Sequence, residues 1–148
     1  MISFSEIPLP RELLFRAGIA YTMRATIEGH GVGAVRHCNF STGSFVEPIT
    51  VWQAPTQLSF DVRQQPDPLT EFSPYGHLET PHLRGVFQSH RGEFRLVRQA
   101  DGSTLLRGTT WYTNQLEPAA YWNLWSDHVI HQIHLRVLRH IRAECERL

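Results

Sequence analysis

The residues best suited to chemistry lie near the end of the sequence, where Asp127, His131 and His134 follow one another at spacings of four and three. In an α-helix, these spacings place the three side chains close together on one face. Carboxylate oxygens and imidazole nitrogens are zinc ligands, and His77 or His82 would supply a further one. The pattern is not HExxH, however. We therefore expect a flanking helix surface and no cofactor, with a metal site at Asp127, His131 and His134 as the alternative.

A second group consists of charged residues within strand-like segments, namely Arg36, Glu47 and Arg107. Alternation turns Glu47 to the same side as Phe45, and Arg107 to the same side as Trp111. If those sides line an interior, the charges need partners, because an unpaired buried charge is strongly destabilising. An Arg–Glu pair could orient a ligand carboxylate or carbonyl, and a carboxylate could act as a general base. The alternative is that bulges or strand ends leave these side chains in water.

Aromatic residues form the third group. Rings with a polar atom suit the wall of a ligand pocket, and any core of this size also contains them. We expect Tyr75 and Trp111 to contact a ligand, and Phe94, Trp122 and Trp125 to pack in the core. The candidate cavity residues are therefore Arg36, Glu47, Tyr75, Arg107 and Trp111.

The elements that must position these residues follow from periodicity. Alternating or β-prone segments bounded by turn residues predict strands at 19–28, 34–40, 44–52, 58–63, 85–99 and 103–114. Pro48 cannot donate to a ladder, so it indicates an edge or a bulge. A short helix is expected at 11–17 and a long one from Pro118 onward. The apolar face of the long helix comprises Trp122, Trp125, Val129, Ile130, Ile133, Val137 and Ile141. The proline-rich segment 65–84 lacks periodicity, which is typical of a functional loop.

Length, composition and the motifs present exclude several classes of protein. The 148 residues fit one domain, 1–148. Fourteen basic residues, all arginine, balance fourteen acidic ones. The formal net charge is therefore zero, and no overall positive potential attracts nucleic acid. No apolar stretch approaches the roughly 18 residues of a membrane span, and no secretory signal is recognised. Cys38 and Cys145 form no CxxC motif and are expected to be reduced thiols in the cytoplasm. No GxSxG or phosphate-binding loop is present.

Several short sequence motifs resemble those of a known superfamily. The run Gly31-Val32-Gly33-Ala34-Val35-Arg36, and Phe45-Val46-Glu47-Pro48-Ile49 followed by Trp52, are similar to the G-x-G-x-x-R and E-x-I-x-x-W strands of bacterial polyketide-cyclase/dehydrase-like members of the START/Bet v 1-like (SRPBCC) superfamily. Gly108-Thr109-Thr110-Trp111-Tyr112 and 122–134 continue the similarity, which covers most of 17–141. The resemblance implies an α+β helix-grip fold, in which a curved antiparallel sheet of about six strands surrounds a long C-terminal helix.

The resemblance also sets our functional expectation, which is that a small hydrophobic or amphipathic molecule is bound or carried in an internal cavity, with 65–84 as a lid. The alternative is a cyclase/aromatase-like enzyme that uses a cavity carboxylate. Only about eighteen residues precede Ile19, so the first strand of the family is expected to be missing. The sheet edge left open would then be covered by a second copy in a homodimer, or the chain would be a shortened relative of a longer protein.

Overall fold

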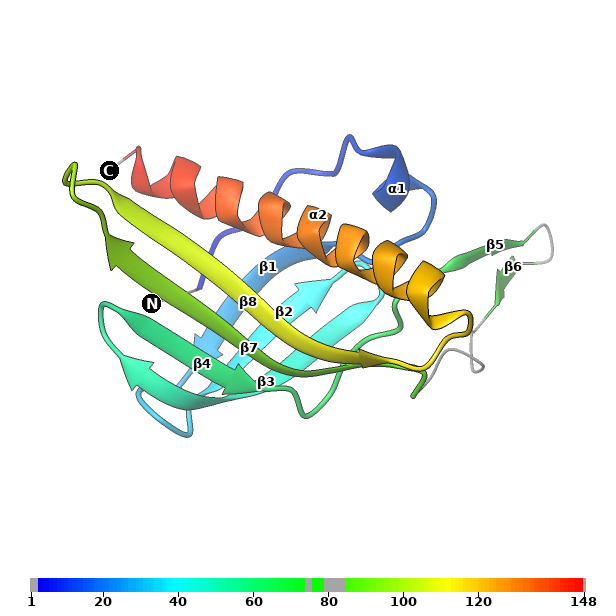
Figure 1. Cartoon of the computed structure of the whole chain (residues 1–148), viewed down its shortest axis with the longest axis horizontal. Coiled ribbons are helices and arrows are strands. Elements are labelled where there is room, and N and C mark those ends of the chain that lie inside the picture. Colours follow the sequence, from blue (N-terminus) through cyan, green and yellow to red (C-terminus); the bar gives the residue numbers. More distant parts are fainter. Residues whose placement is uncertain (1–2, 74–75, 79–84, 148) are drawn as a thin grey trace.

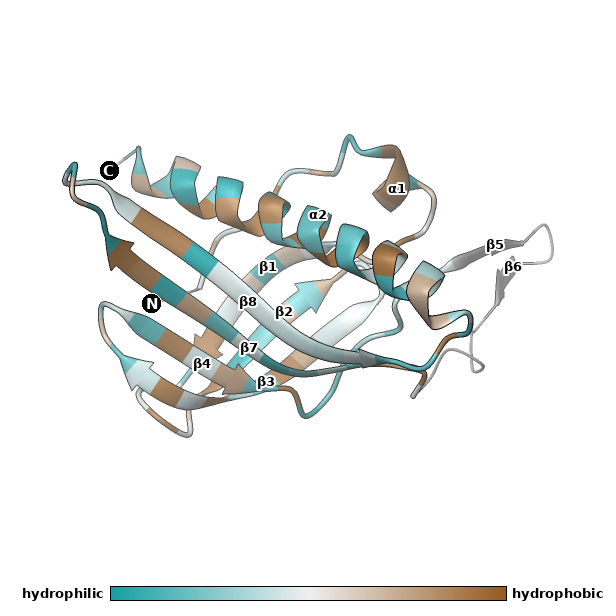
Figure 2. Ribbon diagram, in the orientation of Figure 1, coloured by the Kyte–Doolittle hydropathy of each residue, from teal (hydrophilic) through white to brown (hydrophobic). Residues whose placement is uncertain are grey.

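The alternating segments of the sequence pair into one antiparallel sheet. The computed structural model describes residues 3–73, 76–78 and 85–147. Its sheet has the order β1-β2-β3-β4-β7-β8 (Figure 1). The strands are β1 (Thr22–Glu28), β2 (Val35–Phe40), β3 (Gly43–Gln53), β4 (Gln57–Asp61), β7 (Phe87–Arg98) and β8 (Thr104–Asn114). Brown and teal bands alternate along β4 and β7 in Figure 2, as expected for strands with one face toward an apolar interior.

A single long helix closes the open side of this sheet. Helix α2 (Ala119–Cys145) contacts β8 at one edge of the sheet and β1 at the other. Its inward residues are those of the predicted apolar face, among them Ile133 and Val137. The α+β fold predicted from the sequence, a curved antiparallel sheet with a C-terminal helix, is therefore confirmed.

The segment before the sheet forms little regular structure, but it occupies the seam between β1 and α2. Helix α1 (Leu13–Arg16) spans four residues, fewer than the sequence indicated. Upstream of it, Phe4 forms a single antiparallel bridge with Ala25, whose amide and carbonyl both bond to it at 3.3 and 3.0 Å. The Ile7 amide also donates to the Met23 carbonyl at 2.7 Å. The outer edge of β1 is thus partly paired within the chain, which leaves less of it for a second copy than we expected.

Arg136 connects α2 to β1 and to the N-terminal segment beside it. Its side chain is buried, and it donates from Nε to the Thr22 carbonyl at 3.1 Å and from Nη2 to the Pro8 carbonyl at 2.6 Å. The guanidinium also lies 5.2 Å from the centre of the Tyr21 ring. One side chain therefore links the helix, the first strand and the segment before it.

Part of the predicted loop 65–84 is regular. Strands β5 (Glu71–Ser73) and β6 (Gly76–Leu78) pair as a separate two-stranded sheet. Strands of three residues are too short to produce a periodic pattern, so the sequence did not indicate them. Just before β5, the Ala20 amide donates to the Pro68 carbonyl at 2.9 Å, and the Thr70 amide donates to the Gly18 carbonyl at 2.8 Å. The start of this segment is therefore fixed beside the entry to β1.

Two local features shape the sheet. Pro48 lies in the interior strand β3, opposite Val35, and the register between β3 and β4 shifts just after it, between Ile49 and Val51. Of the two placements that Pro48 indicated, the structure shows the bulge. In β7, a Cβ added at Gly92 would lie 2.4 Å from Cζ of Phe60, so the Phe60 ring rests directly on the glycine backbone.

Candidate functional site

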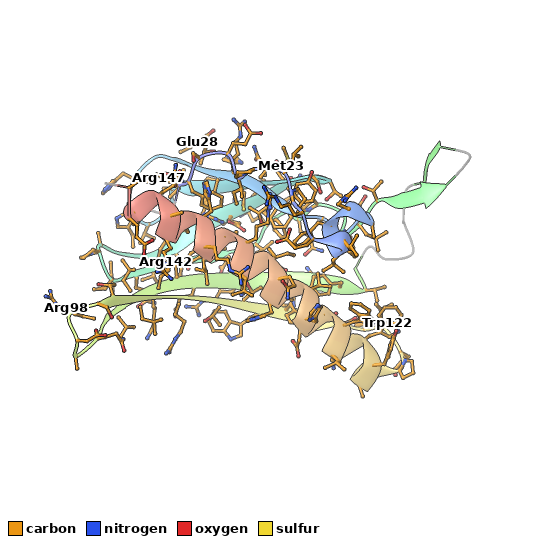
Figure 3. All side chains as sticks on the ribbon, turned by 90° about the horizontal axis from the view of Figure 1, so that it is seen from above. Met23, Glu28, Arg98, Trp122, Arg142 and Arg147 are labelled. Carbon is orange, nitrogen blue, oxygen red and sulfur yellow. The ribbon has the colours of Figure 1, made fainter. Side chains whose placement is uncertain are left out.

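A large cavity lies between the concave face of the sheet and α2. Its volume is about 870 Å³, within the range of about 300–1,000 Å³ that is typical of small-molecule sites. Along α2, the lining residues extend from Trp122 to Leu138, a helical distance of roughly 24 Å. Figure 3 shows Trp122 and Arg142 at opposite ends of this helix, with side chains gathered between the helix and the sheet. Most of the wall is apolar, contributed by every strand of the main sheet and by residues 65–69.

At one end of the cavity, Arg36 and Glu47 form a buried ion pair. They face each other in the β2–β3 register, and Nη1 of Arg36 donates to Oε2 of Glu47. Their side chains are only 3% and 7% exposed. Both residues line the cavity, so opposite charges are placed side by side in its wall.

Aromatic rings surround the guanidinium of Arg36. Its central carbon lies 5.0 Å from the Phe60 ring centre, 5.6 Å from that of Phe94 and 6.0 Å from that of Phe4. The negative faces of aromatic rings attract a cation at such distances, and the attraction is stronger where water is excluded. Four elements therefore hold this one cation: the N-terminal segment, β3, β4 and β7.

Burial and pairing have opposite effects on these groups. Burial would lower the pKa of Arg36, but the neighbouring Glu47 carboxylate and Cys38 raise it, so the guanidinium stays charged. Burial raises the pKa of Glu47, and the Arg36 guanidinium opposes that rise. Burial, with a smaller contribution from Glu47, also raises the pKa of the Cys38 thiol to about 11 against the effect of Arg36. Cys38 is therefore a neutral thiol at neutral pH.

The other polar residues that line the cavity include Thr22 and His134. Thr22 is 1% exposed, and within the described part of the chain its Oγ1 has no hydrogen-bond partner. His134 on α2 shares a hydrogen bond of 2.8 Å between Nε2 and Oγ1 of Thr110 on β8. Burial, and then the nearby His131, lower the pKa of His134, so the imidazole is neutral at neutral pH. Thr22 thus offers an unused hydroxyl, whereas His134 is neutral and already bonded.

The opposite end of the cavity reaches solvent. Trp125 on α2 lines the cavity and is 42% exposed, and Arg91 on β7 is also an exposed lining residue. Pro66, Asp67 and Leu69 line the same cavity from the segment before β5. We call this end, formed by residues 65–69 and the first turns of α2, the mouth.

The structure separates the sequence-predicted site residues into three sets. Arg36 and Glu47 meet in the cavity wall. Arg107 and Trp111 do not line it, because the inward positions of β8 are Gly108 and Thr110, so their predicted place in the cavity is corrected. Both are exposed, and the Trp111 ring instead lies 5.2 Å from the Arg91 guanidinium.

The reason for that correction is that both faces of β8 carry large residues, so alternation alone could not choose between them. The inner position opposite Phe94 is Gly108, which leaves room for that ring. Tyr75, the fifth candidate, lies outside the described residues.

The residues of the alternative metal site have separate partners. Asp127 accepts a hydrogen bond of 2.5 Å from the Tyr112 hydroxyl, His134 is bonded to Thr110, and His131 is exposed. Burial, followed by the bond to Asp127, raises the pKa of Tyr112 to about 12. Among the residues that the structure describes, no three His, Cys, Asp or Glu side chains are placed to hold a metal ion. The three residues have the helical spacing that the sequence predicts, but their side chains have different surroundings. Asp127 and His134 bond to different residues of β8, and His131 is exposed.

Sequence reasoning missed three cavity residues, Thr22, Phe60 and His134. Thr22 and Phe60 did fall in predicted strands, but nothing in their patterns distinguished a cavity wall from a core. His134 was considered only as a metal ligand. Its position four residues after Ile130 and three before Val137, both on the apolar face, was the signal that it points inward.

No protein-family model matches the chain, and no curated protein matches it. In the described part of the chain, no helix combines the length and the apolarity needed to cross a bilayer.

Proposed function

We propose that this protein binds and carries a small hydrophobic or amphipathic molecule, and that it is a member of the START/Bet v 1-like superfamily. The observation that carries the proposal is the cavity of about 870 Å³ with a largely apolar wall. A cavity of this size and character matches sites that enclose most of the surface of a small ligand. The position of α2 against both edge strands supports this, because it leaves the mouth as the route by which a ligand enters.

The segment that begins at Gln65 supports a role at that entrance. Residues 66–69 line the cavity, while backbone hydrogen bonds hold Pro68 and Thr70 against residues 18–20. We propose that the segment 65–84 acts as the lid, with this anchor as its fixed end; positions 74–75 and 79–84 of the segment lie outside the described residues.

Dye binding tests the proposal. 1-Aminoanthracene, an uncharged dye whose fluorescence rises in apolar surroundings, should bind the purified protein and be displaced by apolar molecules. Val129→Trp places a large ring in the cavity and should abolish dye binding. Asn123→Trp, at an exposed position on the same helix, should leave it unchanged. Equal dye binding by both variants would contradict the proposal.

One observation favours a second candidate, an enzyme of the cyclase/aromatase type. The Glu47 carboxylate lines the cavity, burial raises its pKa, and a carboxylate in contact with a substrate can act as a general base. With a polyketide-like substrate, Glu47→Gln should then remove turnover while binding persists. Parallel loss of binding and turnover would favour the carrier.

We propose a cytoplasmic location, which is supported by the two free thiols, Cys38 and Cys145. A homodimer through the β1 edge stays a prediction, and the mass from sedimentation equilibrium tests it. The bonds of Phe4 and Ile7 to β1 already use part of that edge.

A further inference from the structure

The buried charges of the cavity wall cancel. Among the described residues, those with full charges that line the cavity are Arg36, Glu47, Asp67 and Arg91. The first two are in direct contact at the buried end, Asp67 lies at the mouth, and the exposed Arg91 side chain has its guanidinium over the Trp111 ring, outside the cavity. Cys38 and His134, the other titratable side chains of this wall in the described part of the chain, are a neutral thiol and a neutral imidazole bonded to Thr110. A molecule bound at the buried end therefore meets a wall without net charge.

This balance decides which ligands are favourable. The Arg36 guanidinium already contacts a carboxylate and lies near three aromatic rings. A ligand carboxylate at the buried end would stand beside Glu47 and be repelled by it, and a ligand ammonium would stand beside Arg36. In either case a charge leaves water without a partner of its own, which is strongly unfavourable.

A neutral polar group has a place in the same cavity. Thr22 lines the cavity, and its buried Oγ1 has no hydrogen-bond partner within the described residues. A hydroxyl both donates and accepts, so it can pair with an alcohol or a carbonyl of a ligand. Such a bond would satisfy a buried group whose isolation is otherwise unfavourable.

Resting on the proposed binding function, we propose that the cavity selects uncharged amphipathic molecules, with an apolar body and one hydroxyl or carbonyl group, and that Glu47 is the residue that rejects carboxylates. Thr22 is the hydrogen-bonding partner of the ligand's polar group. The Arg36–Glu47 pair makes the buried end polar without making it charged.

The experiment compares 1-dodecanol, dodecanoate and dodecylammonium, which share an apolar chain and differ in charge. Their dissociation constants are measured near neutral pH by displacement of 1-aminoanthracene. The unmodified protein should bind the alcohol at least about tenfold more tightly than either ion, because burial of an unpaired charge is unfavourable whatever its sign. This comparison needs no variant.

Glu47→Gln then tests the assigned residue. Removal of the carboxylate leaves Arg36 to pair with a ligand anion, so the preference for dodecanol over dodecanoate should fall by about tenfold or more. Dodecanoate should also raise the unfolding temperature of this variant more than that of the unmodified protein. The double variant Arg36→Gln/Glu47→Gln has neither charge and should restore the preference for the alcohol. Thr22→Val should weaken dodecanol binding and leave the affinity for the dye unchanged.

The outcomes separate the two proposals. Dodecanoate binding as tight as dodecanol binding in the unmodified protein would overturn the selectivity and leave the carrier function standing. An unchanged preference in folded Glu47→Gln would overturn the role of Glu47. If neither the dye nor any of the three ligands binds, the carrier function itself is wrong.

Discussion

Arg36 on β2 and Glu47 on β3 stand directly opposite each other, and their ion pair is almost wholly buried in the cavity wall. A buried pair depends on both members, because loss of one leaves an uncompensated charge in an apolar setting. The pair thus combines a cross-strand contact with the most polar point of the cavity.

The first prediction concerns the energetics of this pair. Arg36→Met should lower the free energy of unfolding by about 3–5 kcal/mol, because Glu47 then stays buried without a cation. The double variant Arg36→Met/Glu47→Leu should recover most of that loss. Urea unfolding measures both. Equal losses in the two variants would mean that side-chain volume, and not charge pairing, sets the stability here.

The second prediction concerns the close approach of Phe60 to β7. Gly92→Ala should destabilise the protein by about 1–3 kcal/mol, because the new methyl group would overlap the Phe60 ring and displace it from above Arg36. Gly108→Ala is the matched control. Its added Cβ would lie 3.6 Å from the nearest atom, so the free energy of unfolding should change by less than about 0.5 kcal/mol. Thermal unfolding of the two variants makes the comparison.

The third prediction concerns the thiols. Cys145 is exposed, whereas Cys38 is buried and its pKa is raised to about 11, chiefly by burial. Because the thiolate is the reactive form, Ellman's reagent near neutral pH should react quickly with Cys145 and with Cys38 only after denaturation. Cys145→Ser should remove the fast phase and Cys38→Ser should keep it. Two fast thiols would show that the interior is open to the reagent.

The fourth prediction concerns pH. The pKa of His134 is lowered below its ordinary 6.5, first by burial. Between the folded pKa and 6.5, the unfolded chain binds more protons than the folded one, so stability rises with pH across this window and is lost as the pH falls below 6.5. His134→Gln should flatten the dependence of the unfolding temperature on pH in that window. His128→Gln, at an exposed site on the same helix, should retain the original slope.

The fifth prediction concerns the attachment of α2. Arg136→Lys removes the fork that reaches both the Thr22 and the Pro8 carbonyls, so we expect a loss of about 1.5–3 kcal/mol. Hydrogen exchange of the Ile7 and Ala25 amides, which close the seam beside β1, should accelerate. Arg139→Lys on the exposed side of α2 should alter neither quantity.

The sequence predicted the main elements well because their patterns are long. The apolar face of α2 repeats over many turns, and Trp122 through Ile141 lie where the helical period places them. The expected bounds of β3, β7 and β8 lie within two residues of the observed ones at each end. Alternation also put Arg36 and Glu47 on one face, although their direct contact depends on the β2–β3 register, which a pattern within one strand cannot fix.

The features that the sequence could not predict are single contacts between distant segments. The bridge between Phe4 and Ala25 involves one residue on each side and has no periodic signal. The inward face of β8 is the one that carries Gly108, which lies opposite Phe94 of β7, and this pairing depends on the β7–β8 register. The unpartnered hydroxyl of Thr22 becomes visible only when its neighbours are in place.

The seam beside β1 also has a consequence for the order of assembly. The Ser5 hydroxyl bonds to Glu144 although 139 positions separate them, and Arg136 holds the segment that contains Pro8. The cavity therefore gains its helical wall only after α2 has been synthesised and has reached back across the sheet. Until that moment the concave apolar surface is open to the surroundings.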